Sequence, residues 1–121
     1  MNERLTLSQI LLLALYAAGM AGGQLLFKSA ALQYQADASG VRLLGIVQNG
    51  YFIAAIVLYA GLAVFWVWLL SFTPLSRAYP FVALAFALTP MLAALLFGEV
   101  ISTRLWFGVL LILGGLFFVL A

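Results

Sequence analysis

Four long stretches of this chain carry almost no charged side chains, and each is about as long as a helix that crosses a bilayer. Hydrophobic residues make up 68% of the 121 residues and charged residues only 7%, a composition foreign to soluble globular domains. A hydrocarbon core of about 30 Å needs roughly 20 apolar residues per helix, so the chain has room for four spans and little else. The sequence therefore predicts an all-α membrane protein with one domain over residues 1–121. The expected spans run from about Leu7 to Leu32, Tyr51 to Phe72, Ala78 to Phe97 and Arg104 to Leu120.

The connections between these stretches are mostly short, so we expect the four helices to form an antiparallel bundle. The longest connection, Gln33 to Gly50, contains an apolar segment from Val41 to Val47 that predicts a short interfacial helix. Pro90 lies inside the third stretch and is expected to kink or open that helix, because proline removes a backbone donor. Ser102 or Thr103 can cap the fourth helix.

The first stretch is expected to stay in the mature protein as a transmembrane helix. It is longer than the apolar core of a signal peptide, and no small-residue cleavage site with a polar mature region follows it. The sequence thus predicts an integral membrane protein rather than a secreted one.

Charge and composition exclude several classes of function. The five basic residues are spread along the chain and form no patch, which argues against nucleic-acid binding. Cysteine and histidine are absent, so disulfides and the usual zinc ligand sets are excluded, and we expect neither a metal nor a cofactor. No cluster of a nucleophile with a base occurs, so we do not expect an enzyme. The distribution of basic residues leaves the membrane orientation open.

A dimer is the expected working unit, because four helices of this size can hardly enclose a path for a solute. Gly108 and Gly115 are seven residues apart and share one helix face, so a second copy of the fourth helix could approach closely there. Packing within one subunit is the alternative interpretation of these two glycines.

One cation, Lys28, lies near the end of the first stretch. A charged side chain within a membrane span usually has a function. Gln24 and Lys28 are four residues apart and share one helix face. The acids Glu3, Asp37 and Glu99 all fall outside the centres of the predicted spans. No carboxylate at membrane depth therefore faces Lys28.

Short motifs across nearly the whole chain resemble the drug/metabolite transporter superfamily. Its small four-helix members are the most similar, and among them the flippase subunits for aminoarabinose-phosphoundecaprenol. The resemblance is carried by Gly23-Gln24-Leu25-x-x-Lys28, Pro74-Leu75-x-x-Ala78-Tyr79-Pro80, Gly98-Glu99-x-x-x-x-Arg104-x-Trp106-x-Gly108 and Gly114-Gly115.

This resemblance implies transport of a polyprenyl-phosphate-linked sugar across the bacterial inner membrane. It also implies membrane lipid as a partner and a homodimer, or a heterodimer with a related small subunit. The small multidrug exporters carry a glutamate eight residues before the lysine, and Met20 occupies that position here. A thioether can bind neither a proton nor a cationic drug, so the departure favours a lipid substrate.

The resemblance also suggests roles for five polar and aromatic residues. Lys28 and Arg77 suit a phosphate headgroup at opposite membrane surfaces, since both donate several N–H groups. Gln24 and Tyr79 could bind sugar hydroxyls, and Trp66 could line the groove. Snorkelling of Lys28, a topology anchor at Arg77 and an interfacial Tyr79 are the structural alternatives.

Two other functions stay open at this point. Glu99, with nearby aromatic residues, could form the cation site of a small multidrug-resistance-type exporter. The alternative for Glu99 is a structural residue at a helix end, paired with Arg104. The chain could also be a non-transporting partner that stabilises another membrane protein.

Overall fold

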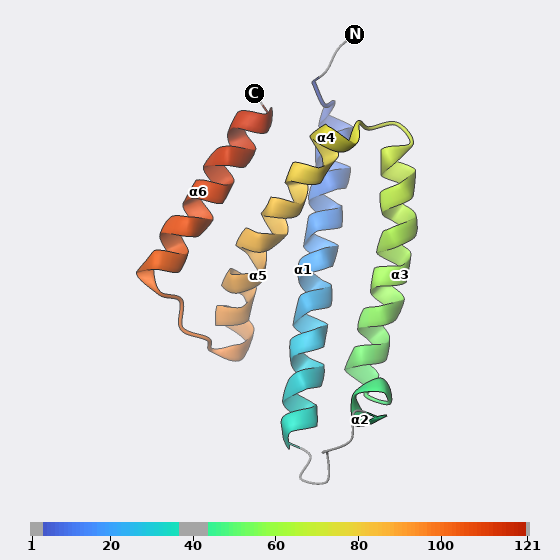
Figure 1. The fold of residues 1–121 in the computed structure, drawn as a ribbon, viewed down its shortest axis with the longest axis vertical. Helices are drawn as coiled ribbons and strands as arrows, with labels where there is room; N and C mark the ends of the chain where they lie inside the picture. The colour runs from blue at the N-terminus through green and yellow to red at the C-terminus, as the bar shows by residue number, and fades with distance from the viewer. Residues whose placement is uncertain (1–3, 37–43, 121) are drawn as a thin grey trace.

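The computed structural model describes residues 4–36 and 44–120, and most of them are helical. The long helices are α1 (Leu7–Ala36), α3 (Gly50–Leu70), α5 (Val82–Phe97) and α6 (Thr103–Leu120), as Figure 1 shows. The short elements are α2 (Leu44–Val47), α4 (Leu75–Ala78) and the 3₁₀ turn η1 (Tyr79–Phe81).

Four segments are long and apolar enough to cross a membrane, and the third joins α4, η1 and α5 into Leu75–Phe97. The prediction of an all-helical chain with four such helices is confirmed for the residues that the structure describes. The acids Glu3 and Asp37, the cation Arg42 and the first part of the predicted interfacial segment lie outside the described residues.

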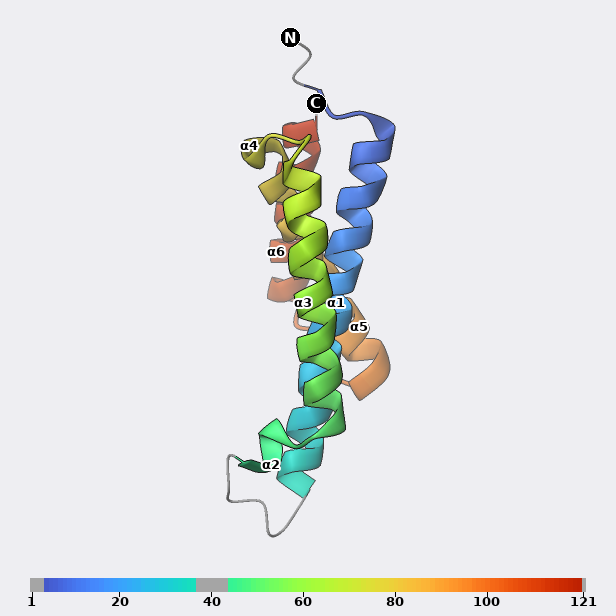
Figure 2. The same cartoon turned by 90° about the vertical axis from the view of Figure 1, so that its right-hand side faces the viewer.

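Helix α1 lies at the centre of the arrangement and packs against α3 on one side and α5 on the other, while α6 packs against α5. The view turned by 90° shows that α1 and α5 lean in opposite directions and cross (Figure 2). The start of α1, the short helix α4 and the end of α6 lie together at one end of the molecule, and α2 lies at the other (Figure 1).

A capping box begins α1 and ties it to the end of α3. The backbone N–H of Thr6 donates to Gln9 Oε1 at 2.8 Å, and the backbone N–H of Gln9 donates to Thr6 Oγ1 at 3.2 Å. The same Gln9 side chain uses Nε2 to donate to the Phe72 carbonyl at 3.0 Å and to Thr73 Oγ1 at 3.2 Å. Thr73 is the buried polar side chain of this turn, and Gln9 satisfies it.

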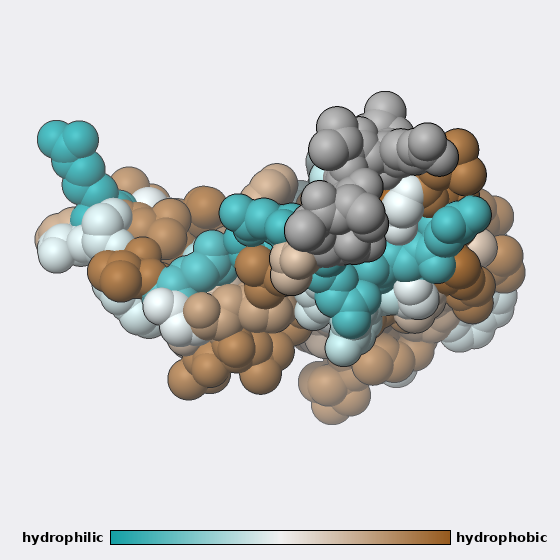
Figure 3. Space-filling model, turned by 90° about the horizontal axis from the view of Figure 1, so that it is seen from below, coloured by the Kyte–Doolittle hydropathy of each residue, from teal (hydrophilic) through white to brown (hydrophobic). Residues whose placement is uncertain are grey.

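A second polar link joins α1 to α3 at the opposite end of the molecule. Asn49 caps α3 by accepting from the backbone N–H of Tyr51 at 2.9 Å, and its Nδ2 donates to Gln33 Oε1 at 2.8 Å. Viewed from this end, hydrophilic residues gather in a band between hydrophobic ones (Figure 3). Polar clamps therefore close both ends of the α1–α3 pair.

The third span begins irregularly because Pro80 supplies no backbone N–H for a regular helix, and a 3₁₀ turn precedes α5. Pro90 lies inside α5, which nevertheless stays helical from Val82 to Phe97. Gly98 then ends α5 in the left-handed conformation, with φ 67°, that glycine adopts without steric cost. Of the two predicted caps of α6, Ser102 accepts from the Leu105 N–H at 3.2 Å.

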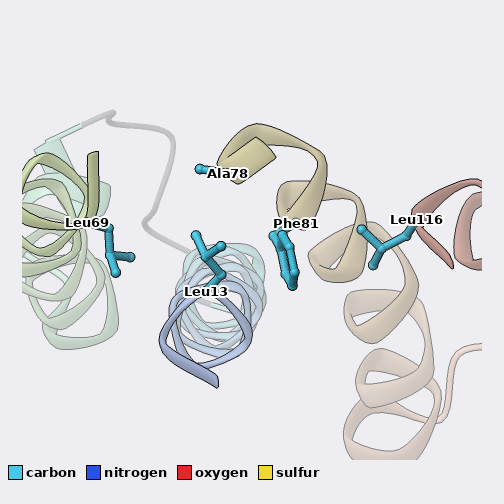
Figure 4. Close-up of a cluster of buried hydrophobic side chains, with 5 residues drawn as sticks. All are labelled: Leu13, Leu69, Ala78, Phe81 and Leu116. Atoms are coloured by element: carbon cyan, nitrogen blue, oxygen red, sulfur yellow. The ribbon is translucent and has the colours of Figure 1, made fainter. Parts of the chain in front are cut away.

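The apolar core lies at the end where α1 begins. Leu13 of α1 sits between Leu69 of α3 and Phe81 of η1, with Ala78 and Leu116 completing the cluster (Figure 4). All five side chains are buried. The core thus holds α1, α3, α6 and the start of the third span together, and leaves the other half of α1 to build a hollow with α5.

Candidate functional site

A hollow of about 340 Å³ lies between α1 and α5. Its apolar lining is interrupted by the Gln24 amide and the Thr89 hydroxyl, and none of the described residues that line it is charged. Such a site, mostly apolar with a few polar groups, is typical of a small-ligand pocket. The lining residues are Met20, Gln24, Val82, Ala85, Phe86, Thr89 and Pro90.

Gln24 is held at this hollow by a tyrosine of the neighbouring helix. Its Nε2 donates to Tyr59 Oη at 2.9 Å, and Tyr59 Oη donates to the Met20 carbonyl at 3.0 Å. The ring of Tyr59 also stacks on Phe27, with ring centroids 5.3 Å apart. The amide that lines the hollow is therefore anchored from the α3 side.

Gly23 lets Tyr59 approach this closely. A Cβ atom at Gly23 would lie 2.6 Å from the Tyr59 ring, and one at Gly19 would lie 2.8 Å from Leu62. At neighbouring Gly22 a Cβ would meet nothing within 4 Å. The spacing of Gly19 and Gly23 thus serves the α1–α3 contact, as small residues do in membrane helix packing.

Pro90 removes a backbone donor of α5 beside the hollow. A residue with an N–H at position 90 would bind the carbonyl of Phe86 in a regular helix, and proline cannot. Both Phe86 and Pro90 line the hollow. In a membrane helix such a carbonyl needs another partner, which a ligand or water can supply.

Lys28 lies one helical turn beyond Gln24 on α1 and is exposed. Helix α1 has 30 residues and is about 45 Å long at about 1.5 Å per residue, so it extends past a hydrocarbon core of about 30 Å. If the membrane begins near Leu7, Lys28 falls close to the opposite boundary. The structure therefore places this exposed cation one helical turn beyond a residue that lines the hollow.

Trp66 and Tyr79 are brought together through a line of aromatic rings. Tyr16 stacks on Trp66 with ring centroids 4.7 Å apart, and Trp66 meets Tyr79 edge to face at 6.5 Å. Tyr79 is 62% exposed, whereas Trp66 packs against the apolar core. This aromatic cluster lies toward the α4 end of the molecule and is separate from the lining of the hollow.

Arg77 lies in α4 and donates to the Val119 carbonyl at 2.7 Å. That carbonyl belongs to the last turn of α6, where backbone acceptors lack helical donors and a cation is favoured. Arg77 therefore joins the third span to the end of α6, a role that the sequence did not indicate.

Glu99 lines a second hollow of about 260 Å³, between the end of α5 and the start of α6. The two hollows share Thr89 and Pro90, so they lie on either side of the same turn of α5. Glu99 is exposed, and within the part of the chain that the structure describes no ion pair joins it to Arg104. The structural alternative that paired these two residues is not seen.

Gly108 and Gly115 lie on α6 with open space beside them. A Cβ atom at either position would meet nothing within 4 Å among the described residues. The α6 face that carries them is therefore not used for close packing within the subunit. No group of three or more His, Cys, Asp or Glu that could hold a metal occurs in residues 4–36 and 44–120.

The structure also reveals site residues that the sequence did not single out. Tyr59 anchors Gln24, and Thr89 lines both hollows. The one available signal for Tyr59 was a hydroxyl in the middle of the apolar helix Gly50–Leu70, where a polar group needs a partner.

Comparison with known proteins identifies the family. The chain is 38% identical over 106 residues to the probable 4-amino-4-deoxy-L-arabinose-phosphoundecaprenol flippase subunit ArnE of Serratia proteamaculans (strain 568), covering 88% of this chain and 90% of that protein. This chain belongs to the ArnE flippase subunit family. The probable ArnE of Pseudomonas fluorescens (strain Pf0-1) is 40% identical over 63 residues, which cover 52% of this chain and 54% of that protein.

Membership of the ArnE family confirms the resemblance found in the motifs. Its named members are flippase subunits, which are transport proteins, and the four apolar helices agree with a multi-pass membrane protein. No protein-family model matches the chain, and no solved structure matches it.

Proposed function

We propose that this chain is one subunit of a flippase that moves a polyprenyl-phosphate-linked amino sugar across the bacterial inner membrane. The substrate class follows the named relatives, whose printed substrate is 4-amino-4-deoxy-L-arabinose-phosphoundecaprenol. The observation that carries the proposal is an uncharged hollow, lined by Gln24, with Lys28 one helical turn away on the same face of α1.

The spacing between Gln24 and Lys28 suits a sugar joined directly to a phosphate. Four helical residues rise about 6 Å, comparable with the distance from the middle of a sugar ring to its phosphate. Lys28 would bind the phosphate by charge-assisted hydrogen bonds, while the uncharged hollow takes the sugar. The polyprenyl tail would stay in lipid along the apolar surface of α5, where Phe86 is 64% exposed.

Arg77 is proposed to receive the phosphate at the other membrane surface. It lies in α4, at the end of the molecule where α1 begins, whereas Lys28 lies about 30 Å along α1 from that end. The guanidinium has several N–H donors, so it can bind a phosphate in addition to the Val119 carbonyl. Tyr79 and Trp66 beside it would contact the sugar at that surface.

The working assembly is proposed to contain two subunits, each an antiparallel bundle of four helices. Gly108 and Gly115 on α6 have no side chains, and a Cβ atom at either position would meet no described residue of their own subunit within 4 Å. A partner helix could therefore approach closely at this surface. The partner is either a second copy or a related small subunit, in keeping with the word subunit in the relatives' names.

Lipid that co-purifies with the protein tests this proposal. The assembly is purified from bacterial inner membranes through a tag on this chain, and its lipids are extracted and identified by mass spectrometry. We expect enrichment of a polyprenyl-phosphate-linked amino sugar over the bulk membrane. If the sample shows no such enrichment and instead transports a quaternary ammonium dye in a Glu99-dependent manner, the chain is a cation exporter.

A further inference from the structure

The direction of the hydrogen bond between Tyr59 and Gln24 follows from the chemistry of their neighbours. The Met20 carbonyl oxygen, 3.0 Å from Tyr59 Oη, can only accept, so it takes the single phenolic proton. The Tyr59 oxygen is then left to accept a hydrogen bond from Gln24, 2.9 Å away. The Gln24 amide must therefore turn its Nε2 toward Tyr59.

This orientation determines what the Gln24 amide offers to a ligand. Among the described residues the Gln24 side chain makes no other hydrogen bond, so Oε1 keeps its capacity as an acceptor. A freely rotating amide could offer either its oxygen or its nitrogen to the hollow. Tyr59 removes that choice by binding the nitrogen end.

The opposite wall of the hollow offers acceptors as well. Pro90 leaves the Phe86 carbonyl without its helical donor, and a carbonyl can only accept. The Thr89 hydroxyl can donate or accept. With no charged residue among the described lining, the site is matched to a ligand that donates N–H or O–H groups.

Gly23 is the residue that makes this arrangement possible. The Tyr59 ring lies where a Cβ atom at position 23 would be, at 2.6 Å. The neighbouring residues Gly23 and Gln24 therefore work together, because the first admits the tyrosine that orients the second.

We infer that Tyr59 is a positioning residue that fixes the Gln24 amide, so that the hollow between α1 and α5 selects an amino or hydroxyl donor of the sugar. This inference rests on the proposed function, since it takes the ligand to be a sugar-bearing lipid. It adds a specificity determinant that touches no ligand itself and acts only through Gln24.

Two lipids that differ only in the sugar test the inference. The assembly, purified through a tag on this chain, is titrated by native mass spectrometry with undecaprenyl phosphate and with undecaprenyl phosphate carrying 4-amino-4-deoxy-L-arabinose. The ratio of the two dissociation constants isolates the contribution of the sugar, because tail and phosphate are common to both. We expect Tyr59→Phe to lower this preference by about tenfold, the effect of one hydrogen bond, with unchanged affinity for undecaprenyl phosphate.

A double-mutant cycle separates positioning from a general structural effect. Gln24→Ala should lower the sugar preference by a similar factor, and adding Tyr59→Phe should lower it no further. Gly23→Ala should reproduce the loss by displacing the tyrosine ring, whereas Gly22→Ala, with open space beside it, should retain the wild-type ratio.

The outcomes distinguish this inference from the proposal on which it rests. Retention of the sugar preference in Tyr59→Phe, or full additivity with Gln24→Ala, overturns the role of Tyr59. Equal binding of both lipids by the wild-type protein overturns the sugar site but leaves a phosphate-binding flippase. If the wild-type protein binds neither lipid, the proposed function fails and the inference with it.

Discussion

The guanidinium of Arg77 donates a hydrogen bond of 2.7 Å to the carbonyl of Val119, and so joins α4 to the last turn of α6. The backbone acceptors at a helix end have no helical donors, and a cation there also meets the negative end of the helix dipole. A residue that the sequence offered as a headgroup ligand or topology anchor is thus also part of the helix packing.

Replacing Arg77 tests this packing role. Arg77→Gln should lower the free energy of unfolding by about 1–2 kcal/mol, because it removes a charge-assisted hydrogen bond. Arg77→Lys should lower the free energy of unfolding by a smaller amount, because lysine keeps the positive charge but lacks the planar guanidinium. Thermal unfolding in detergent, followed by tryptophan fluorescence, measures both. An unchanged midpoint in Arg77→Gln would contradict the assigned role.

Gln9 offers a nearly isosteric test of the clamp between α1 and the turn after α3. Gln9→Glu keeps the oxygen that accepts from Thr6 but has no N–H to donate, so the cap survives and the hydrogen bond to the Phe72 carbonyl is lost. We expect a loss of about 1 kcal/mol and faster hydrogen exchange at residues 71–73. Unchanged exchange in that turn would show that the clamp does not hold it.

The open glycine face of α6 predicts a change in assembly without a change in fold. Gly115→Leu should shift the purified protein from two subunits to one, measured by light scattering in detergent, with helix content retained. Gly114→Leu is the matched control, because this adjacent glycine also has open space but lies on a different face of α6. Equal effects of the two substitutions would argue against a specific contact at Gly115.

Met20 lies in the lining of the hollow and allows a change of specificity. Met20→Glu would place a carboxylate beside Gln24, so we expect micromolar binding of a quaternary ammonium dye that the wild-type protein lacks. Because the ionised carboxylate attracts the dye, its binding should weaken as the pH falls. Met20→Gln controls for size and polarity, and dye binding by that variant would disprove the electrostatic explanation.

Much of the fold could be predicted from hydropathy, and the differences have physical causes. The prediction ended the first span near Leu32, while α1 continues to Ala36, because hydropathy reports membrane depth and a helix can extend beyond it. In this polar extension, Asn49 Nδ2 donates a hydrogen bond to Gln33 Oε1. The third span was expected to begin at Ala78, but α4 begins at Leu75 and Pro80 introduces the 3₁₀ turn.

The candidate site could be predicted only in part, because its decisive contacts join different helices. The face shared by Gln24 and Lys28 follows from their spacing along α1. The role of Tyr59 does not, since it depends on the close approach of α3 that Gly23 permits. The hydrogen bond from Arg77 to the Val119 carbonyl likewise joins residues far apart in the sequence. Nothing in the sequence around either residue predicts that the two meet.

Lipid flipping in proteoliposomes tests the central claim most directly. The purified assembly is reconstituted with 4-amino-4-deoxy-L-arabinose-phosphoundecaprenol, and the fraction of headgroup amines accessible to an impermeant reagent is followed over time. We predict that the wild-type protein accelerates exposure of the inner-leaflet lipid. Lys28→Met should lower the flipping rate at least tenfold while the protein remains folded. Arg104→Met, which also removes an exposed cation, is the matched control and should keep the wild-type rate. Wild-type flipping rates in Lys28→Met, or no flipping by the wild-type assembly, would contradict the account.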